Sequence, residues 1–260
     1  MLVTRASRLA RRCACGACGG IVAQADEGKP FATDPAEAID FLRRKLNVPT
    51  SSWTDLWQEQ HSVAFTVAGA QSDALVADFH DAINDAIKDG TTLDDFRARF
   101  DRIVADHGWS YNGSRNWRSR VIFQTNLRTA YAAGKWDQIQ RVKESRPYLR
   151  YVAVMDGRTR AEHRDWNNTV LPADDPWWQT HYPPNGWNCR CTVQSLNDRD
   201  LARYGLAVAN KAPPVEMVER TINTPDGPRT VLVPEGIDPG FAYRPGAPPS
   251  EALKALIDGR

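Results

Sequence analysis

Apolar residues recur at helical spacing through the first half of the chain. The period appears in four stretches, and short turns that contain Gly or Pro separate them from one another. A fifth and longer stretch follows. Amphipathic helices joined by short turns pack as antiparallel neighbours, so we predict a helical bundle over residues 31–146. The predicted helices cover residues 33–46, 52–64, 72–90, 92–108 and 115–141.

Residues with strong positional preferences mark the ends of several of these helices. Asp34 suits the N-cap ahead of Pro35, which suits the first helical position. Gly90 and Gly108 stand where the third and fourth helices should stop, and Thr92 stands where the fourth should start. The spacing also predicts side chains that face the core, namely Ile39, Leu42, Leu46, Trp53, Leu56, Trp57, Ala64, Leu75, Phe79, Ile83, Ile87, Trp117, Val121, Thr125 and Tyr131.

After Pro147 the apolar period changes to that of β-strands. The segments YLRYVAVMD and CRCTVQSL predict strands near residues 149–155 and 189–195. A short helix should begin at Thr159, where Glu162 would complete a capping box.

The stretch between the two strands is rich in Pro and Trp. Residues 167–188 show little periodicity, which predicts a long loop. After the second strand, DRDLARYG predicts a short helix, and VEMVERTI with RTVLVPEG predicts a hairpin around the TPDGP turn. We therefore predict an α+β fold, in which the helical bundle is followed by a small α+β domain with a short antiparallel sheet at residues 147–244 and a tail at 245–260.

The overall composition excludes two classes of protein. The chain has 33 basic and 32 acidic side chains, so its formal charge of +1 gives no molecule-wide attraction for nucleic acid. The mean hydropathy is −0.53, and no apolar run approaches the roughly 20 residues that cross a bilayer. We therefore expect no membrane span and no general affinity for polyanions.

Basic residues are nevertheless concentrated in one segment. The segment from Ser114 to Arg146 contains eight Arg or Lys side chains and only two Asp or Glu side chains. Two interpretations stay open, a solvated helix face whose arginines lie over apolar neighbours, or a contact surface for DNA or an acidic partner. The residues that would touch DNA are Arg115, Arg118, Arg120 and Arg128.

Three of the five cysteines lie near the start of the chain. Cys13, Cys15 and Cys18 could bind metal, but the glycines around them and the lack of a nearby fourth ligand favour a flexible arm over residues 1–30. The same segment lacks the apolar centre of an export signal, so we expect synthesis in the cytoplasm.

The other two cysteines belong to a second candidate site. Residues i and i+2 of a strand point to the same side, so Cys189 and Cys191 should present two sulfurs on one face. Zinc accepts two thiolates with one or two imidazoles, which makes His163 the expected third ligand and His181 the expected fourth. Such a zinc ion would be structural. The alternative is two small buried cysteines beside a hydrogen-bonded histidine.

The remaining polar residues of this region favour a scaffold over a catalyst. Asp156 and Arg158 could pair with each other or cap backbone groups at the end of the first strand. The turn formed by Pro183, Pro184, Asn185 and Gly186 should present Trp187 directly before the cysteines.

Together these segments resemble a known family. The element D-x-R-T-x-x-x-H, which begins at Asp156 and includes Thr159, and the element P-P-N-G-W-x-C-R-C, which ends at Cys191, are similar to those of the phage Mu F-like head-morphogenesis family. The resemblance is best between residues 120 and 196.

This resemblance implies a minor head protein that serves in capsid assembly near the portal. It does not decide whether the protein also takes part in DNA packaging or ejection. Its partners would be the portal and capsid proteins, with phage DNA as a further candidate. It would be found in the host cytoplasm during assembly and then in the virion head.

A metal-dependent hydrolase, such as a nuclease or a toxin-like domain, is the competing function. In it, His163 and the thiols would hold zinc while Asp156 positions water. The sequence contains no HExxH, P-loop, G-x-S-x-G or kinase motif, which disfavours this alternative.

Overall fold

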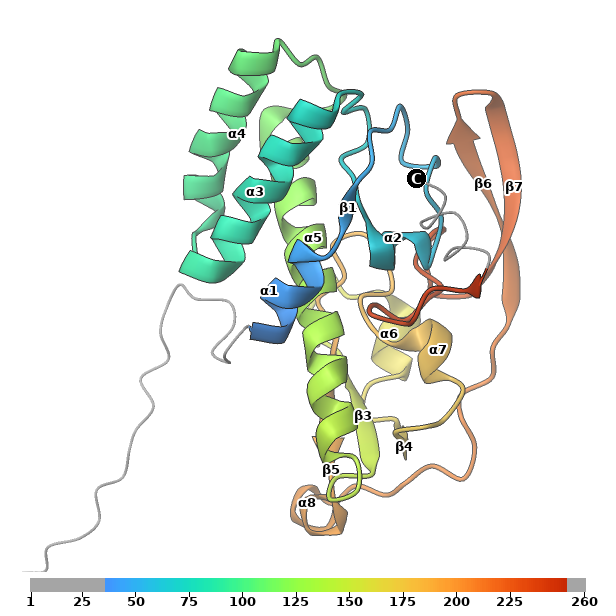
Figure 1. Ribbon diagram of the computed structural model, residues 1–260. Helices are drawn as coiled ribbons and strands as arrows, with labels where there is room; N and C mark the ends of the chain where they lie inside the picture. Colours follow the sequence, from blue (N-terminus) through green and yellow to red (C-terminus); the bar gives the residue numbers. More distant parts are fainter. Residues whose placement is uncertain (1–35, 252–260) are drawn as a thin grey trace, which may run out of the picture. The chain divides into compact units, whose positions relative to one another are not determined.

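The computed structural model describes residues 36–251 (Figure 1). The predicted arm, its three cysteines and the helix start at Asp34 lie outside the described residues. The helices are α1 Ala36–Arg43, α2 Gln60–Val63, α3 Asp73–Asp89, α4 Leu93–His107, α5 Arg115–Val142, α6 Ala161–Asp165, α7 Trp178–His181 and α8 Asp198–Tyr204. The strands are β1 Leu46–Asn47, β2 Ala64–Phe65, β3 Tyr148–Val152, β4 Val170–Pro172, β5 Thr192–Leu196, β6 Met217–Thr224 and β7 Gly227–Pro234.

Helices α3 and α4 end where their capping residues predict. Gly90 and Gly108 take left-handed φ values of 64° and 56°, which residues with a Cβ rarely adopt. At the start of α4, the Thr92 side chain accepts a hydrogen bond from the backbone N–H of Asp95, whose side chain accepts one from Thr92 N–H. Both predicted helices are confirmed.

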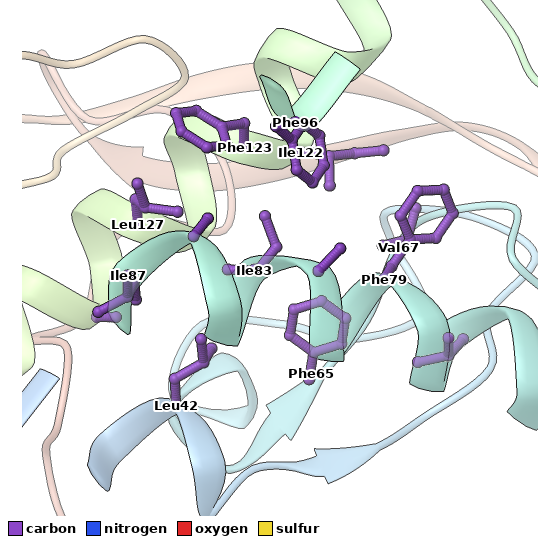
Figure 2. Close-up of a cluster of buried hydrophobic side chains, with 14 of the residues drawn as sticks. Leu42, Phe65, Val67, Phe79, Ile83, Ile87, Phe96, Ile122, Phe123 and Leu127 are labelled. Atoms are coloured by element: carbon purple, nitrogen blue, oxygen red, sulfur yellow. The ribbon is translucent and has the colours of Figure 1, made fainter. Parts of the chain in front are cut away.

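A hydrophobic core lies between these helices and α5. The predicted stripe of α3 is buried in full, and Phe79 and Ile83 are completely covered. Figure 2 shows side chains from α1, β2, α3, α4 and α5 that meet there. The residues labelled in that view are Leu42, Phe65, Val67, Phe79, Ile83, Ile87, Phe96, Ile122, Phe123 and Leu127.

The predicted second helix is wrong. Residues 51–59 form turns and bends, and only Gln60–Val63 is helical. The Asp55 carboxylate accepts hydrogen bonds from the backbone N–H groups of Ser51 and Ser52, at 2.7 and 3.1 Å. Side-chain acceptors of this kind compete with the helical hydrogen bonds. The apolar spacing alone therefore predicted a helix over residues 52–64 that does not form.

The face predicted for α1 also needs correction. Leu46 is 41% exposed and lies in the short strand β1, which pairs in parallel with β2 at Ala64. The buried side chains of α1 are Ala38, Phe41 and Leu42.

Helix α5 has the predicted length but not the predicted buried face. Trp117 is 43% exposed, while Ile122 and Phe123 are buried in the core described above. Further along the same helix, Trp136 and Ile139 enter a second core with the sheet. A helix that touches two cores lacks a single apolar stripe, so periodicity could not locate its buried side. The division into two domains at residue 146 stays a prediction.

The C-terminal part is built on a three-stranded sheet of order β4–β3–β5. Both pairings are antiparallel, and Leu149 of β3 lies between Leu171 of β4 and Ser195 of β5. The predicted long loop therefore contains strand β4 and helix α7 (Figure 1). The α8 helix and the β6–β7 hairpin are present as predicted. The fold class is thus α+β, as predicted, and none of the described helices is long and apolar enough to cross a bilayer.

Replacing Gly134 with alanine should destabilise the protein by about 1–3 kcal/mol. A Cβ at this position of α5 would lie 2.7 Å from the backbone nitrogen of Ala38 and 3.1 Å from its Cα, so α1 would have to move away. Alanine at the exposed Gln140 of the same helix should change stability by less than about 0.5 kcal/mol. Urea unfolding followed by circular dichroism measures both variants. Equal stability of the two would contradict this helix contact.

Candidate functional site

The two downstream cysteines lie just before strand β5 and not within it. Cys189 is 5% exposed and Cys191 is half-buried. The backbone turns at this point, because Asn188 has a positive φ of 58° and Cys189 N–H donates to the Gly186 carbonyl at 3.1 Å. The two sulfurs lie on one side, as the sequence predicted, although Cys189 and Cys191 precede the strand and are not part of it.

The side chain of His163 faces both sulfurs from helix α6. Its Nδ1 lies 3.4 Å from Cys191 Sγ and 3.8 Å from Cys189 Sγ. On the other side of the ring, Nε2 donates to the Gly236 carbonyl at 2.8 Å. A carbonyl can only accept, so Nε2 carries the proton and, in the neutral ring, Nδ1 presents a lone pair to the cysteines.

Backbone amides support the two sulfurs. The backbone N–H of Asn185 favours the thiolate form of Cys189, and the backbone N–H of Val154 favours that of Cys191. The hydrogen bond with Cys191, helped by His163, lowers the pKa of the Cys189 thiol well below its usual range. The hydrogen bond with Cys189 and burial raise the pKa of Cys191. One negative charge is thus stabilised at the pair.

Aromatic side chains pack against the ring of His163. The ring of Trp166 stacks on His163 with centroids 5.1 Å apart. Tyr151 of β3 is fully buried and donates from its hydroxyl to Asn185 Oδ1 at 2.9 Å. Burial raises the pKa of Tyr151 well above its ordinary value, so its hydroxyl stays protonated at neutral pH.

His181 does not join this group. Among the described His, Cys, Asp and Glu side chains, the cluster with mutually close ligand atoms contains His163, Cys189 and Cys191. His181 is buried, stacks on Trp177 at 4.4 Å and has its Nδ1 2.8 Å from the Thr180 hydroxyl. Burial lowers its pKa to about 4. Its predicted role as a fourth ligand stays a prediction.

The carboxylate of Asp156 has a partner that the sequence did not reveal. Both of its oxygens accept from Arg190, at 2.7 and 2.5 Å. It also accepts from the backbone N–H of Arg158 at 3.0 Å, while the Arg158 side chain is largely exposed. The hydrogen bonds from Arg190 hold the pKa of Asp156 well below its usual range.

The capping box predicted at Thr159 is wrong. The N-cap of α6 is Arg160, and no side chain caps it. The Thr159 hydroxyl instead donates to the Val154 carbonyl. This contact closes the turn after β3, and α6 begins one residue later than the predicted cap would place it.

The Pro183–Gly186 turn is held by a residue from the far end of the chain. Asp238 Oδ2 accepts from the backbone N–H of Trp187 at 2.8 Å and from Arg160 at 2.6 Å. The bond between Pro183 and Pro184 is cis. A Cβ on Gly186 would lie 2.3 Å from Asp238 Oδ2, so only glycine fits there. Asp238 is too distant in sequence for any local motif to have indicated it.

A cavity of about 500 Å³ lies beside Trp187. Its volume is in the range of ligand pockets. Lys45 lines it and is only 8% exposed, and burial lowers the pKa of this amine to about 7. The cavity is lined by Lys45, Trp53, His61, Ala64, Thr66, Val67, Ala68, Trp117, Arg118, Val121, Ile122, Thr125, Asn126, Thr129, Trp187, Asn188, Pro239, Gly240, Phe241 and Tyr243.

Comparison with known proteins identifies one matching family and two similar phage or prophage proteins. The family model described as "Phage Mu protein F like protein" matches residues 77–194. Protein F of Escherichia phage Mu, named as a candidate capsid assembly protein, is 33% identical over 251 aligned positions, which cover 86% of this chain and 56% of that protein. The Mu-like prophage FluMu F protein of Haemophilus influenzae is 34% identical over 183 positions, which cover 66% of this chain and 44% of that protein. The chain belongs to the phage Mu F-like family.

This Mu F-like chain spans about half the length of the curated relatives it matches. No solved structure matches it significantly. The matched range runs from α3 into β5 and includes His163, Cys189 and Cys191. The predicted resemblance is therefore confirmed, and the three-residue cluster lies within the part of the chain that defines it.

The four arginines proposed for DNA contact differ in their surroundings. Arg115 forms an ion pair with Asp101. Arg118 donates to the Ala68 carbonyl and lies over the ring of Trp109, and Arg128 donates to the Cys189 carbonyl. Arg120 is exposed. Three of the four are thus bound within this Mu F-like chain, which favours the interpretation as a structural helix face.

Proposed function

We propose that the chain is a capsid assembly protein of a tailed phage, which acts by binding other head proteins and not by turnover. Membership of the Mu F-like family carries this proposal. His163 is only 2% exposed, which leaves little surface for a substrate beside it and fits a structural role.

We also propose a site of action near the portal, with synthesis in the host cytoplasm and incorporation into the virion head. The resemblance supports this finer assignment. A part in DNA packaging or ejection would need a surface for phage DNA. Arg115 and Arg120 are the exposed members of the predicted set, and Arg115 is paired with Asp101. Local phosphate contacts of this kind would weaken with salt.

The arrangement of Asp156 disfavours a metal-dependent hydrolase. A general base must be free to accept a proton from water within hydrogen-bond reach of the metal. Arg190 holds both oxygens of Asp156 and lowers its pKa. The carboxylate is therefore a poor base and a good structural anchor.

A phage that carries a nonsense mutation in the gene for this chain should produce no DNA-filled heads. Electron microscopy of the lysate measures this, and mass spectrometry of purified wild-type heads should find the chain. Expression of the intact gene in the host is the control and should restore filled heads. Normal heads made in its absence would contradict the proposal.

The hydrolase alternative is tested on the purified protein. It would be incubated with DNA or RNA in the presence of Zn²⁺, Mg²⁺ or Mn²⁺. We expect no cleavage above that of a mock purification. Cleavage that disappears in folded Asp156→Asn and His163→Gln variants would establish an enzyme and overturn the structural role.

A further inference from the structure

We propose that His163, Cys189 and Cys191 bind one Zn²⁺ as a structural ion. This inference goes beyond the proposed function, because it concerns the stability of the module and holds whatever partner the protein binds. Its basis is the geometry of three ligand atoms, Nδ1 and two Sγ, that all lie within 4.8 Å of one another.

The distances match those of a tetrahedral zinc site. Zinc binds sulfur at about 2.3 Å and imidazole nitrogen at about 2.0–2.1 Å, which places a nitrogen and a sulfur ligand about 3.6 Å apart. The observed distances from His163 Nδ1 are 3.4 Å to Cys191 Sγ and 3.8 Å to Cys189 Sγ. An ion would therefore enter with small side-chain adjustments.

The hydrogen bonds around the ligands are those that metal sites require. A zinc-bound histidine usually donates its second N–H to a carbonyl or carboxylate, and His163 does so to Gly236. A metal-bound thiolate is an acceptor, and the backbone N–H groups of Asn185 and Val154 favour the thiolate forms of Cys189 and Cys191. These contacts orient the ligands toward one point.

The site would connect segments that are far apart in sequence. His163 is on α6, the cysteines precede β5, and Gly236 follows β7. His163 and Cys189 are 2% and 5% exposed. An ion in such a buried place would link the turn at residues 183–191 to the helix, and its binding energy would contribute to folding.

The described residues supply three ligands, and a tetrahedral ion takes four. Water would fill the fourth position. Cys13, Cys15 and Cys18 are the other cysteines of the chain, so they are the competing candidates for zinc. Their substitution provides a matched control, with the same change of cysteine to serine in the same chain.

The experiment measures bound metal in the full-length protein. We expect one zinc per chain by elemental analysis after purification without added chelator. With Co²⁺ in place of zinc, thiolate charge-transfer bands and the visible bands of tetrahedral cobalt should appear. The melting temperature of the metal-free wild-type protein should rise as free Zn²⁺ is added, because the ion binds the folded state.

Variants then locate the ion. Cys189→Ser with Cys191→Ser should remove the metal, the charge-transfer bands and the effect of Zn²⁺ on the melting temperature. His163→Gln should weaken binding, whereas His163→Cys supplies a new ligand and should retain it. Circular dichroism identifies variants that fail to fold, and for these the titration of the metal-free wild type decides.

The serine triple variant of Cys13, Cys15 and Cys18 completes the test. Retention of one zinc and of the cobalt spectrum in this variant supports the site at His163, Cys189 and Cys191. The proposal would be overturned if the serine triple variant lost its zinc and the double variant of Cys189 and Cys191 retained it. A metal-free wild type that Zn²⁺ does not stabilise, or a Cys189–Cys191 disulfide in the purified protein, would also overturn it.

Discussion

Replacing Lys45 with methionine should raise the free energy of unfolding at pH 7 by roughly 3 kcal/mol. The amine is 8% exposed, and its pKa is lowered from 10.5 to about 7 because burial disfavours the charged form. Lowering the pKa of a lysine this far means that protonation destabilises the folded state. Methionine has a similar length and carries no charge, so it removes this cost.

The surroundings of Lys45 explain why the cost is not compensated. Its ammonium lies 4.8 Å from the centre of the Phe41 ring. Among the described ion pairs there is none to Lys45, and no Asp or Glu lines the cavity beside it. Half-buried His61 and buried His80 interact with it, and burial lowers the pKa of each. Both rings are therefore mostly neutral at pH 7.

The effect should depend on pH in a defined direction. Between about pH 7 and 10.5 the unfolded chain holds the Lys45 proton more tightly than the folded chain does. Stability therefore rises with pH across this window, and the full cost is present below it. The advantage of Lys45→Met over wild type should shrink as the pH approaches 10.

Urea unfolding at pH 6, 7, 8 and 9 measures this difference. Arg44→Met is the control, since Arg44 is an exposed cation next to Lys45 in the sequence, and its effect should stay within about 0.5 kcal/mol. A destabilised Lys45→Met variant, or a gain independent of pH, would show that Lys45 is not a buried charged amine.

Replacing Trp178 with alanine should cost about 3–5 kcal/mol of stability. The side chain is fully buried in the second core. Its ring lies 5.0 Å from that of Trp177, and its Nε1–H donates to the Pro172 carbonyl of β4 at 3.0 Å. The substitution would leave a cavity and remove one of the two hydrogen bonds to the Pro172 carbonyl, which also accepts from the backbone N–H of Asp175 at 3.0 Å.

Two further variants separate the effect of the lost buried volume from that of the lost hydrogen bond. Trp178→Phe keeps most of the volume and loses the N–H donor, and the Pro172 carbonyl keeps its bond from Asp175. Its cost should therefore be about 0.5–1.5 kcal/mol. Trp117→Ala removes a tryptophan that is 43% exposed, and should cost less than about 1 kcal/mol. Denaturant unfolding followed by far-UV circular dichroism compares them. Similar costs for Trp117 and Trp178 would contradict the assignment of the second core.

Local sequence signals were sufficient for several elements. The glycine and threonine at the ends of α3 and α4 act on backbone groups within four residues, so their effect can be predicted without a fold. The same is true of the α8 helix and the β6–β7 hairpin. The motif that begins at Asp156 and ends at Cys191 was sufficient for the family.

Other features depend on contacts between distant segments. Helix α5 buries different sides against two cores, so no single stripe predicts its face. Asp156 meets Arg190, and Asp238 holds the turn before the cysteines, across 34 and 51 residues respectively. Neither pair has a local pattern.

The candidate site shows most clearly which features the sequence predicts and which depend on the tertiary structure. By itself the sequence determined the ligand types, because two cysteines two residues apart and one histidine suit zinc by their chemistry, and it determined the family through its motif. Only the tertiary structure decided how closely the His163 ring approaches both sulfurs, and that the cysteines lie in the segment before β5 and not within it. Those outcomes depend on the packing of α6 against the turn and on Gly236 after β7, and such long-range packing has no signature within any one segment.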